Sequence, residues 1–224
     1  SHIPTSRTTP AGGMPGARPL PEKYWRTHDQ LTALAACAVA TERIRLGTGI
    51  NLIAQRDPIW TAKEAATVDV LSNGRLQFGI GYGWNVEEMA SHGTDYAQRR
   101  ALTREKMLMM KSLCTDDVAS FEGELISLEP SWAWPKPVQK PHPPIIMGAG
   151  AGPKTIAHMV EFCDGWIPLG RHEIGPKVGE VRHALEDAGR DPAAFQFINY
   201  GTRSDEGFVE SLAEMGFSEA VFGP

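Results

Sequence analysis

The sequence predicts an α/β fold in which parallel strands alternate with helices. Two observations support this class. From residue 29 onward, apolar residues at helical spacing and short β-branched runs follow one another along the chain. Turn residues, mainly Gly, Pro and Asn, separate these segments. Six strands and no internal repeat are expected, which leaves a closed barrel and a doubly wound open sheet as the alternatives. The whole chain, 1–224, is expected to form a single domain.

The first elements follow a long loop. Residues 1–27 are rich in Pro, Gly, Thr and Arg and show no apolar period, so we expect a loop there. Apolar spacing then predicts a helix from about residue 30, and the run IRLGTGINL at 44–52 predicts a strand. Asp57 before Pro58 is typical of a helix start, with the aspartate as N-cap. That helix is expected to end near residue 71.

The middle of the chain continues the alternation. Gly74 fits a left-handed helix C-cap, and residues 75–80 are expected to form a buried strand. Asn85 has the spacing of an N-cap, with Glu88 three residues later. A longer helix is expected over about 96–113.

An excursion at 120–144 interrupts the pattern, with a short hairpin expected near Glu122 and Gly123 and a Pro-rich stretch after it. The alternation then resumes. Strands are expected at 145–148, 165–169, 195–200 and 220–222, and helices at 153–162, 176–188 and 206–215.

Composition excludes several functions. The chain has 22 Lys and Arg against 27 Asp and Glu, a net charge of −5, which argues against nucleic-acid binding. No apolar run is long enough for a membrane span, so we expect a cytoplasmic protein with no membrane partner. The three cysteines are far apart, and metal-ligand spacings such as C-x-x-C or H-E-x-x-H are absent, so no metal site is expected.

Two glycine-rich turns are candidates for ligand binding. Residues 79–85 (GIGYGWN) leave a strand and enter a helix, so backbone there can approach a flat or phosphorylated ligand; a simple tight turn is the alternative. Residues 148–155 (GAGAGPKT) place free N–H groups, a helix start and Lys154 together, which suits a phosphate. The alternative is a turn that binds nothing, with a solvated lysine.

Aromatic and histidine residues add to this picture. His2 lies in the opening loop, where it either contacts substrate or is merely solvated. No G-x-S-x-G motif is present, which argues against acyl transfer. Trp25 and Trp60 are expected to be packing residues. Some of the four tryptophans near the ends of strands are expected to supply walls of a pocket for a planar ring: Trp84, Trp132, Trp134 and Trp166.

The runs ATERIRLGTGI, RDPIWTAKEAATVDVLSNGRLQFGIGYGWNVEEM, KPHPPIIMGAGAGPKT and CDGWIP, in this order, resemble the bacterial-luciferase-like family. More narrowly, they resemble its actinobacterial branch, which uses the deazaflavin coenzyme F420. The resemblance implies a (β/α)₈ TIM barrel, here lacking the first two strands and the last helix. It also implies redox chemistry on a flavin or deazaflavin.

The resemblance also implies site residues. It places a non-prolyl cis peptide between Gly49 and Ile50, behind the cofactor ring. The ring is expected to lie against the turn Gly81, Tyr82, Gly83, Trp84 and Asn85. The cofactor phosphate is expected at Gly148, Ala149, Gly150, Gly152 and Lys154.

Two departures from the family pattern limit what can be transferred. The acidic–His dyad that contacts the ring in this family would precede Ser1, so the catalytic residues are unknown. Trp84 stands where related sugar-phosphate dehydrogenases carry a glutamate, so their acid/base mechanism and substrate do not transfer. Trp84 and His2 remain as expected substrate-pocket residues.

Three functional hypotheses follow. The first is an oxidoreductase that transfers a hydride between F420 and a small organic substrate covered by the loop at 4–27. The second is a monooxygenase that uses flavin mononucleotide (FMN), and the third is a non-catalytic or truncated cofactor-binding relative. A homodimer is the expected assembly.

Overall fold

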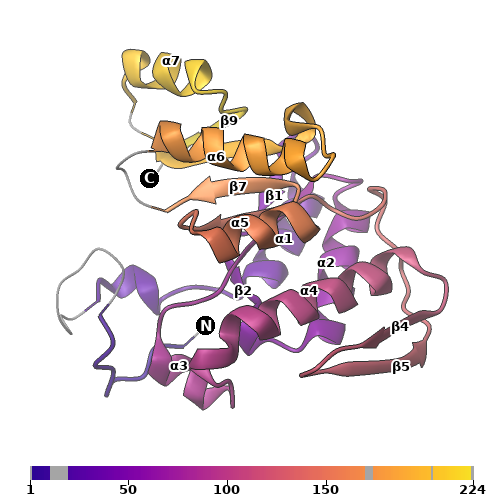
Figure 1. Cartoon of the computed structure of the whole chain (residues 1–224). Coiled ribbons are helices and arrows are strands. Elements are labelled where there is room, and N and C mark those ends of the chain that lie inside the picture. The colour runs from indigo at the N-terminus through magenta and orange to yellow at the C-terminus, as the bar shows by residue number, and fades with distance from the viewer. Residues whose placement is uncertain (1, 11–19, 170–173, 203, 223–224) are drawn as a thin grey trace. The chain divides into compact units, whose positions relative to one another are not determined.

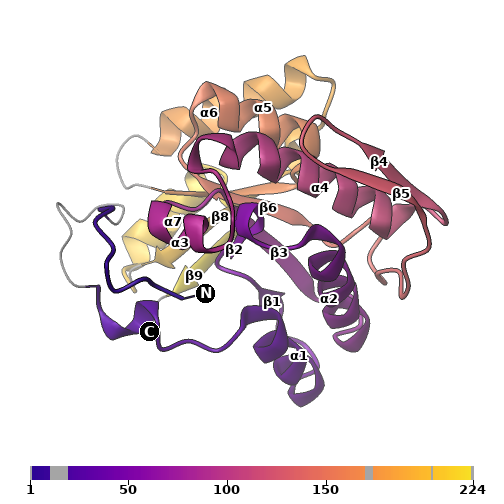
Figure 2. The ribbon, with the colours of Figure 1, turned by 90° about the horizontal axis from the view of Figure 1, so that it is seen from below.

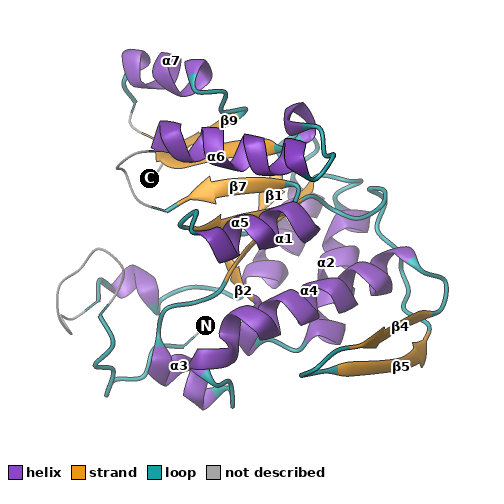
Figure 3. Cartoon of the chain, viewed as in Figure 1, coloured by secondary structure: helices purple, strands orange, loops and turns teal. Residues whose placement is uncertain are grey.

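A computed structural model describes residues 2–10, 20–169, 174–202 and 204–222 (Figure 1). The expected loop at 1–27 therefore lies partly outside the described residues. The chain divides into two compact units, Ser1–Pro143 and Pro144–Pro224. Helices and strands alternate in both units, as the sequence predicted (Figure 3). Among the described residues, no helix is long and apolar enough to cross a membrane.

Among its described residues, the first unit contains four α-helices and a small parallel sheet. Strand β3 is the shared partner of two short strands: β1 pairs with its first residues and β2 with its last ones, both in parallel. Helix α1 packs on α2, and α2 packs on both β3 and α4. The elements are η1 (Glu22–Tyr24), α1 (Gln30–Ala40), β1 (Leu46–Gly47), β2 (Asn51–Leu52), η2 (Ile53–Gln55), α2 (Pro58–Leu71), β3 (Leu76–Gly81), α3 (Val86–Ser91), η3 (Tyr96–Gln98) and α4 (Arg99–Thr115).

Local signals in the sequence explain where these helices begin. Asp57 caps α2 by accepting a hydrogen bond from the backbone N–H of Trp60 at 2.8 Å, as predicted. The cap satisfies one of the N–H groups that a helix start leaves unpaired. The predicted helix at 96–113 begins with a short 3-10 turn, because Asp95 accepts from the N–H of Ala97 and caps that turn first.

The expected single strand at 44–52 was wrong in one respect. The structure divides it into β1 and β2, which pair with different parts of β3. The peptide bond between Gly49 and Ile50 is cis, as the resemblance implied. Thr48, Gly49 and Ile50 lie between the two short strands, and the N–H of Thr48 donates to the carbonyl of Gln77 at 3.3 Å.

Arg75 fastens the start of β3 to the end of α1. Its guanidinium donates to the carbonyl oxygens of Ala38, Thr41 and Ile44, at 2.8, 2.8 and 2.9 Å. These carbonyls lie at or beyond the helix end, where they have no partner within the helix. One side chain thus fixes the connection between α1 and β1.

The excursion at 120–144 starts with the predicted hairpin, formed by β4 (Ala119–Glu122) and antiparallel β5 (Ser127–Ser131). Glu105 of α4 holds its turn by accepting hydrogen bonds from the backbone N–H groups of Glu124, Leu125 and Ile126. The sequence did not reveal this role of Glu105, because the contact spans about twenty residues.

In the part of the second unit that the structure describes, four parallel strands form a sheet in the order β6, β7, β8, β9. Helices α5 and α6 pack against each other (Figures 1 and 2). Ile146, Ile167 and Ile198 come from three adjacent strands and form a buried cluster. The elements are β6 (Ile145–Ala149), α5 (Pro153–Phe162), β7 (Gly165–Pro168), α6 (Ile174–Asp187), η4 (Pro192–Ala194), β8 (Gln196–Thr202), α7 (Glu206–Glu214) and β9 (Glu219–Phe222).

Candidate functional site

The structure brings the predicted cofactor residues together in two groups, one in each unit. The first group lies at the carboxyl ends of β2 and β3. Parallel pairing of Leu52 with Gly81 sets the segment after the cis Gly49–Ile50 bond beside the turn at 81–85. The carboxyl ends of parallel strands are where α/β proteins place their ligand sites.

Glycine is required at two positions of this group. A Cβ added to Gly79 would lie 2.0 Å from the carbonyl oxygen of Thr48, which is backbone and has little freedom to move. Gly83 has a φ of +80°, and its Cβ would lie 2.3 Å from Cε of Met89. The glycines predicted from the GIGYG run therefore have a packing role as well as an expected binding role.

The side chains of the turn are anchored from several elements. Tyr82 is buried, and the Arg100 guanidinium lies 4.4 Å from its ring centroid. Trp84 is half-buried, with the guanidinium carbon of Arg7 5.5 Å from its ring centroid. Cationic groups at these distances are attracted to the ring face. Both aromatic rings are thus held in place by arginines of other segments.

Asn85 combines a structural and a potential binding role. Its Oδ1 accepts a hydrogen bond from the backbone N–H of Glu88 at 3.2 Å and so caps α3, as predicted. Its Nδ2 is buried and has no hydrogen-bond partner among the described residues. A buried donor without a partner is costly, and it fits a ligand that offers an acceptor, such as a ring carbonyl.

Asn51 is a residue that the sequence reasoning missed. It is 1% exposed, and both atoms of its carboxamide lack a partner in the described part of the chain. It pairs with Ile80, so the side chains of Asn51 and Ile80 point to the same face of the sheet. Position 81 faces the opposite side. A polar residue inside the apolar run GINLI was the signal that could have found it.

The two expected substrate residues lie at opposite ends of α3. Trp84 precedes its N-cap, whereas His2 contacts His92, its C-cap, with the two ring centroids 5.1 Å apart. Burial lowers the pKa of His92, and the nearby His2 lowers it further, so the His92 imidazole is favoured in its neutral form. Segment 2–9 therefore runs along this helix.

Lys106 supports the same group from behind. Its ammonium donates to the carbonyl oxygens of Ala54 and Arg56, at 2.8 and 2.6 Å, directly after β2. Burial lowers the pKa of Lys106. Gln55, in the same 3-10 turn, donates to Glu88 of α3 at 2.8 Å. These contacts fix the backbone that follows the cis bond.

The second group is the turn that follows β6. The N–H of Gly152 donates to the carbonyl of Gly150 at 2.9 Å, and Gly152 caps α5 without a side-chain hydrogen bond. A Cβ at either glycine would have no atom within 4 Å. Packing therefore does not require these two glycines, in contrast to Gly79 and Gly83. Their backbone is open to an approaching ligand.

The charge of this second turn suits an anion. Lys154 is exposed in the first turn of the ten-residue α5, whose N-terminus carries a partial positive charge. Gly148 and Ala149 end β6 and are buried. The carbonyl of Ala149 accepts a hydrogen bond of 2.8 Å from Nε1 of Trp166. The backbone N–H groups, helix end and lysine fit the phosphate of a cofactor.

The expectations for the other tryptophans need correction. Trp166 is 2% exposed and packs edge-on against Phe197, so it is a core residue of β7 and not a pocket wall. Trp60 is 67% exposed and is not a packing residue. Its place on the outer side of α2 follows from the helical period, which the sequence reasoning did not apply to it.

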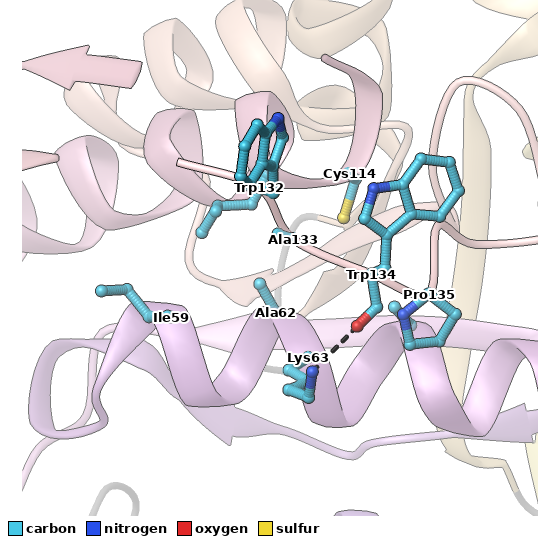
Figure 4. A pocket seen from close by; sticks show the side chains of 10 residues that line it. Ile59, Ala62, Lys63, Cys114, Trp132, Ala133, Trp134 and Pro135 are labelled. Atoms are coloured by element: carbon cyan, nitrogen blue, oxygen red, sulfur yellow. Dashed lines mark hydrogen bonds between the residues drawn. The ribbon is translucent and has the colours of Figure 1, made fainter. Parts of the chain in front are cut away.

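Trp132 and Trp134 do line a pocket, but this pocket contains no residue of the two glycine turns (Figure 4). The pocket has a volume of about 100 Å³ and lies between α2, the end of α4 and the segment that contains the cis Trp134–Pro135 bond. Lys63 donates to the carbonyl of Trp134 at 2.8 Å. None of the predicted cofactor residues lines it.

Other candidates for catalysis or metal binding are weak. Burial raises the pKa of the Cys114 thiol to about 11, so this residue is a thiol and not a nucleophilic thiolate at neutral pH. Within the described ranges, no group of three His, Cys, Asp or Glu residues is placed to hold a metal ion.

Comparison with known proteins identifies a family and two similar structures. A family model described as luciferase-like monooxygenase matches residues 17–203. An uncharacterized protein of Mycobacterium tuberculosis is 38% identical over 225 residues, which cover 100% of this chain and 79% of that protein.

Two solved structures share the fold. Monooxygenase RslO1 from Streptomyces bottropensis matches with a TM-score of 0.73 and 24% identity, over 89% of this chain and 62% of that one. The coenzyme F420-dependent tetrahydromethanopterin reductase from Methanopyrus kandleri matches with a TM-score of 0.68 and 22% identity. The match covers 81% of this chain and 57% of that one. This chain thus spans less than two thirds of either structure. The two TM-scores confirm the expected α/β fold of the luciferase-like barrel type.

Proposed function

Because the chain belongs to the luciferase-like monooxygenase family, we propose that it is an oxidoreductase that transfers a hydride between coenzyme F420 and a small organic substrate. The observation that carries the proposal is the contrast between the two glycine turns. The turn at 81–85 is closely packed and holds an unpartnered buried donor, whereas the turn at 150–152 is open at its two glycines and lies beside Lys154 and the start of α5. The first kind of surface suits a flat ring, and the second kind suits a phosphate.

Each group of residues has a defined task in this proposal. The backbone of Gly81 and Gly83 lies against the ring, and Nδ2 of Asn85 donates to an acceptor on it. Lys154 and the N–H groups at the start of α5 hold the phosphate. The coenzyme, when bound, supplies the hydride chemistry, and the chain supplies position and electrostatics. Trp84 and His2 line the substrate side of the site.

The alternative within the same family is an FMN-dependent monooxygenase. RslO1, which shares the fold, is named as a monooxygenase, whereas the Methanopyrus reductase is named as F420-dependent. The same phosphate turn suits either cofactor. A deazaflavin has carbon in place of nitrogen-5 and reacts poorly with oxygen, so the identity of the cofactor separates the two reactions. We also propose that the protein is cytoplasmic and forms a homodimer.

The test is a titration of the purified protein with oxidised F420 and, separately, with FMN, followed by fluorescence, with molecular mass measured in the same samples. We expect F420 to bind more tightly than FMN, and a dimer mass. Lys154→Ala should weaken F420 binding by about tenfold, or ~1.4 kcal/mol. Lys177→Ala is the matched control, because Lys177 lies in the same unit, is half-buried and pairs with Glu180.

The other outcomes are equally informative. Binding of FMN alone would replace the proposal with the monooxygenase. Binding of neither cofactor by a folded, monodisperse protein would favour the non-catalytic relative.

A further inference from the structure

Glu87, in the first turn of α3, accepts four hydrogen bonds from two consecutive threonines near the N-terminus. The backbone N–H and the hydroxyl of Thr8 donate to its Oε1 at 2.6 and 2.8 Å. The N–H of Thr9 donates to the same oxygen at 3.1 Å, and the Thr9 hydroxyl donates to Oε2 at 2.5 Å. One carboxylate therefore fastens a segment that lies almost 80 residues away in the sequence.

The residues that precede this attachment make further contacts. Arg7 precedes the two threonines, and its guanidinium carbon lies 5.5 Å from the ring centroid of Trp84. The N–H of Arg7 donates to the carbonyl of Pro4 at 3.1 Å, which closes a turn. At the other end of the segment, His2 contacts His92. We refer to residues 2–9 as the strap.

Apolar packing contributes little to holding the strap. None of residues 2–9 is buried, and the half-buried ones are Ile3, Pro4, Arg7 and Thr9. We therefore expect the four hydrogen bonds to the Glu87 carboxylate to contribute strongly to its attachment, beside the contacts of Arg7 with Trp84 and of His2 with His92, because charge-assisted hydrogen bonds are about twice as strong as neutral ones. Loss of the Glu87 carboxylate should release the strap without disturbing the core.

We propose that Glu87 is a positioning residue for the substrate side of the site: it fastens the strap over Trp84 and so limits the access of small molecules to this side chain. The proposal rests on the proposed function insofar as Trp84 bounds the substrate pocket. It makes the strap a determinant of substrate entry, separate from the residues that hold the cofactor. Its physical content can be tested without any cofactor.

The first test uses acrylamide as the small-molecule probe. Each protein is measured with and without Trp84→Phe. Subtracting the signal of the Trp84→Phe protein cancels the other tryptophans and leaves the fluorescence of Trp84. We expect Glu87→Ala to increase the quenching constant of Trp84 by about threefold, since the attachment opens locally. Glu186→Ala, on an exposed part of α6, is the control and should leave it unchanged.

The second test is limited proteolysis with trypsin, which cleaves after Arg7. We expect cleavage of the Arg7–Thr8 bond to be at least about tenfold faster in Glu87→Ala, because cleavage follows the population of the open segment. The double variant Thr8→Val, Thr9→Val removes the two hydroxyl donors from the strap itself and should have a smaller effect. It also keeps the proposal testable if Glu87→Ala does not fold.

Binding of F420 separates this proposal from the previous one. The F420 dissociation constant of Glu87→Ala should stay within about twofold of the wild-type value. Equal quenching and equal cleavage in the wild type and both variants would overturn the strap. A released strap in a protein that binds no F420 would instead overturn the proposed cofactor and leave the strap supported.

Discussion

The hydroxyl of Thr48 donates a hydrogen bond of 2.6 Å to the carbonyl oxygen of Gly79. The carbonyl oxygen of Thr48 also lies 2.0 Å from the place where a Cβ on Gly79 would stand. The two backbones can approach this closely only because residue 79 has no side chain. This contact holds the segment with the Gly49–Ile50 bond beside β3, and therefore beside the turn at 81–85.

The contact predicts a strong effect of a small substitution. Gly79→Ala should lower the free energy of unfolding by about 3 kcal/mol, because backbone on both sides would have to move. Urea denaturation followed by far-UV circular dichroism measures it. Gly179→Ala is the control: it lies within α6 with no atom within 4 Å of its Cβ, and should stabilise by up to about 1 kcal/mol. Similar stabilities of the two variants would contradict this account.

Asp69 predicts a second loss of stability. It is fully buried, and its carboxylate accepts hydrogen bonds from the backbone N–H and Nε2 of Gln139, at 3.0 and 2.7 Å. Asp69→Ala should cost about 2–3 kcal/mol, since two donors of the half-buried Gln139 lose a buried charged acceptor. Asp117→Ala, at an exposed position, should change the urea midpoint little. A midpoint for Asp69→Ala equal to that of the control would show that this anchor is dispensable.

The cysteines should differ in reactivity. Cys37 is exposed, whereas Cys114 and Cys163 are buried. Alkylation with iodoacetamide at pH 8, followed by peptide mass mapping, should modify Cys37 more than about tenfold faster than Cys114. Comparable rates in the folded protein would be inconsistent with the packing around α4.

Cys114 also predicts a dependence of stability on pH. Burial raises its pKa from 9.0 to about 11, so the folded chain holds this proton more tightly than the unfolded chain does. The resulting contribution to stability is fully present below pH 9 and is lost as the pH rises from 9 toward 11. Cys114→Ala should remove this part of the alkaline loss, as measured by thermal unfolding between pH 8 and 11. An unchanged alkaline profile would contradict it.

The strap should respond to acid. Its hydrogen bonds, chiefly those from Thr9 and Thr8, lower the pKa of Glu87 from 4.5 to about 2. The attachment is therefore fully present above pH 4.5 and weakens as the pH falls through 2. Acrylamide quenching of Trp84 should rise over this range in the wild type and not in Glu87→Ala. Arg7, Glu88, His2 and His92 lie nearby in both proteins, so the difference between them reports Glu87.

Much of the fold could be predicted because the signals are local. Asp57 and Pro58 mark the start of α2, and Asn85 marks that of α3, in agreement with the structure. The helix at 153–162 was predicted with the bounds that the structure gives to α5. Caps and apolar periods depend on neighbouring residues only, so one sequence is enough to find them.

Long-range contacts could not be predicted in the same way. Nothing near Glu87 in the sequence indicates that Thr8 and Thr9 are its partners, and nothing near Glu105 indicates the hairpin turn. The prediction for Trp166 was wrong for a related reason: its position near the end of a strand did not reveal that its side chain is buried in the core. The glycine turns were found from their composition. Only the geometry shows that packing requires a glycine at position 79 and leaves room for a side chain at position 150.

The most direct test of the central claim compares the affinity for F420 with that for its deazariboflavin chromophore without the phosphate. If Lys154 and the turn at 150–152 hold the phosphate, the wild type should prefer F420 by at least about tenfold, and Lys154→Ala should lose most of this preference. Equal affinities for the two molecules in the wild type, or a preference that Lys154→Ala leaves intact, would contradict the account.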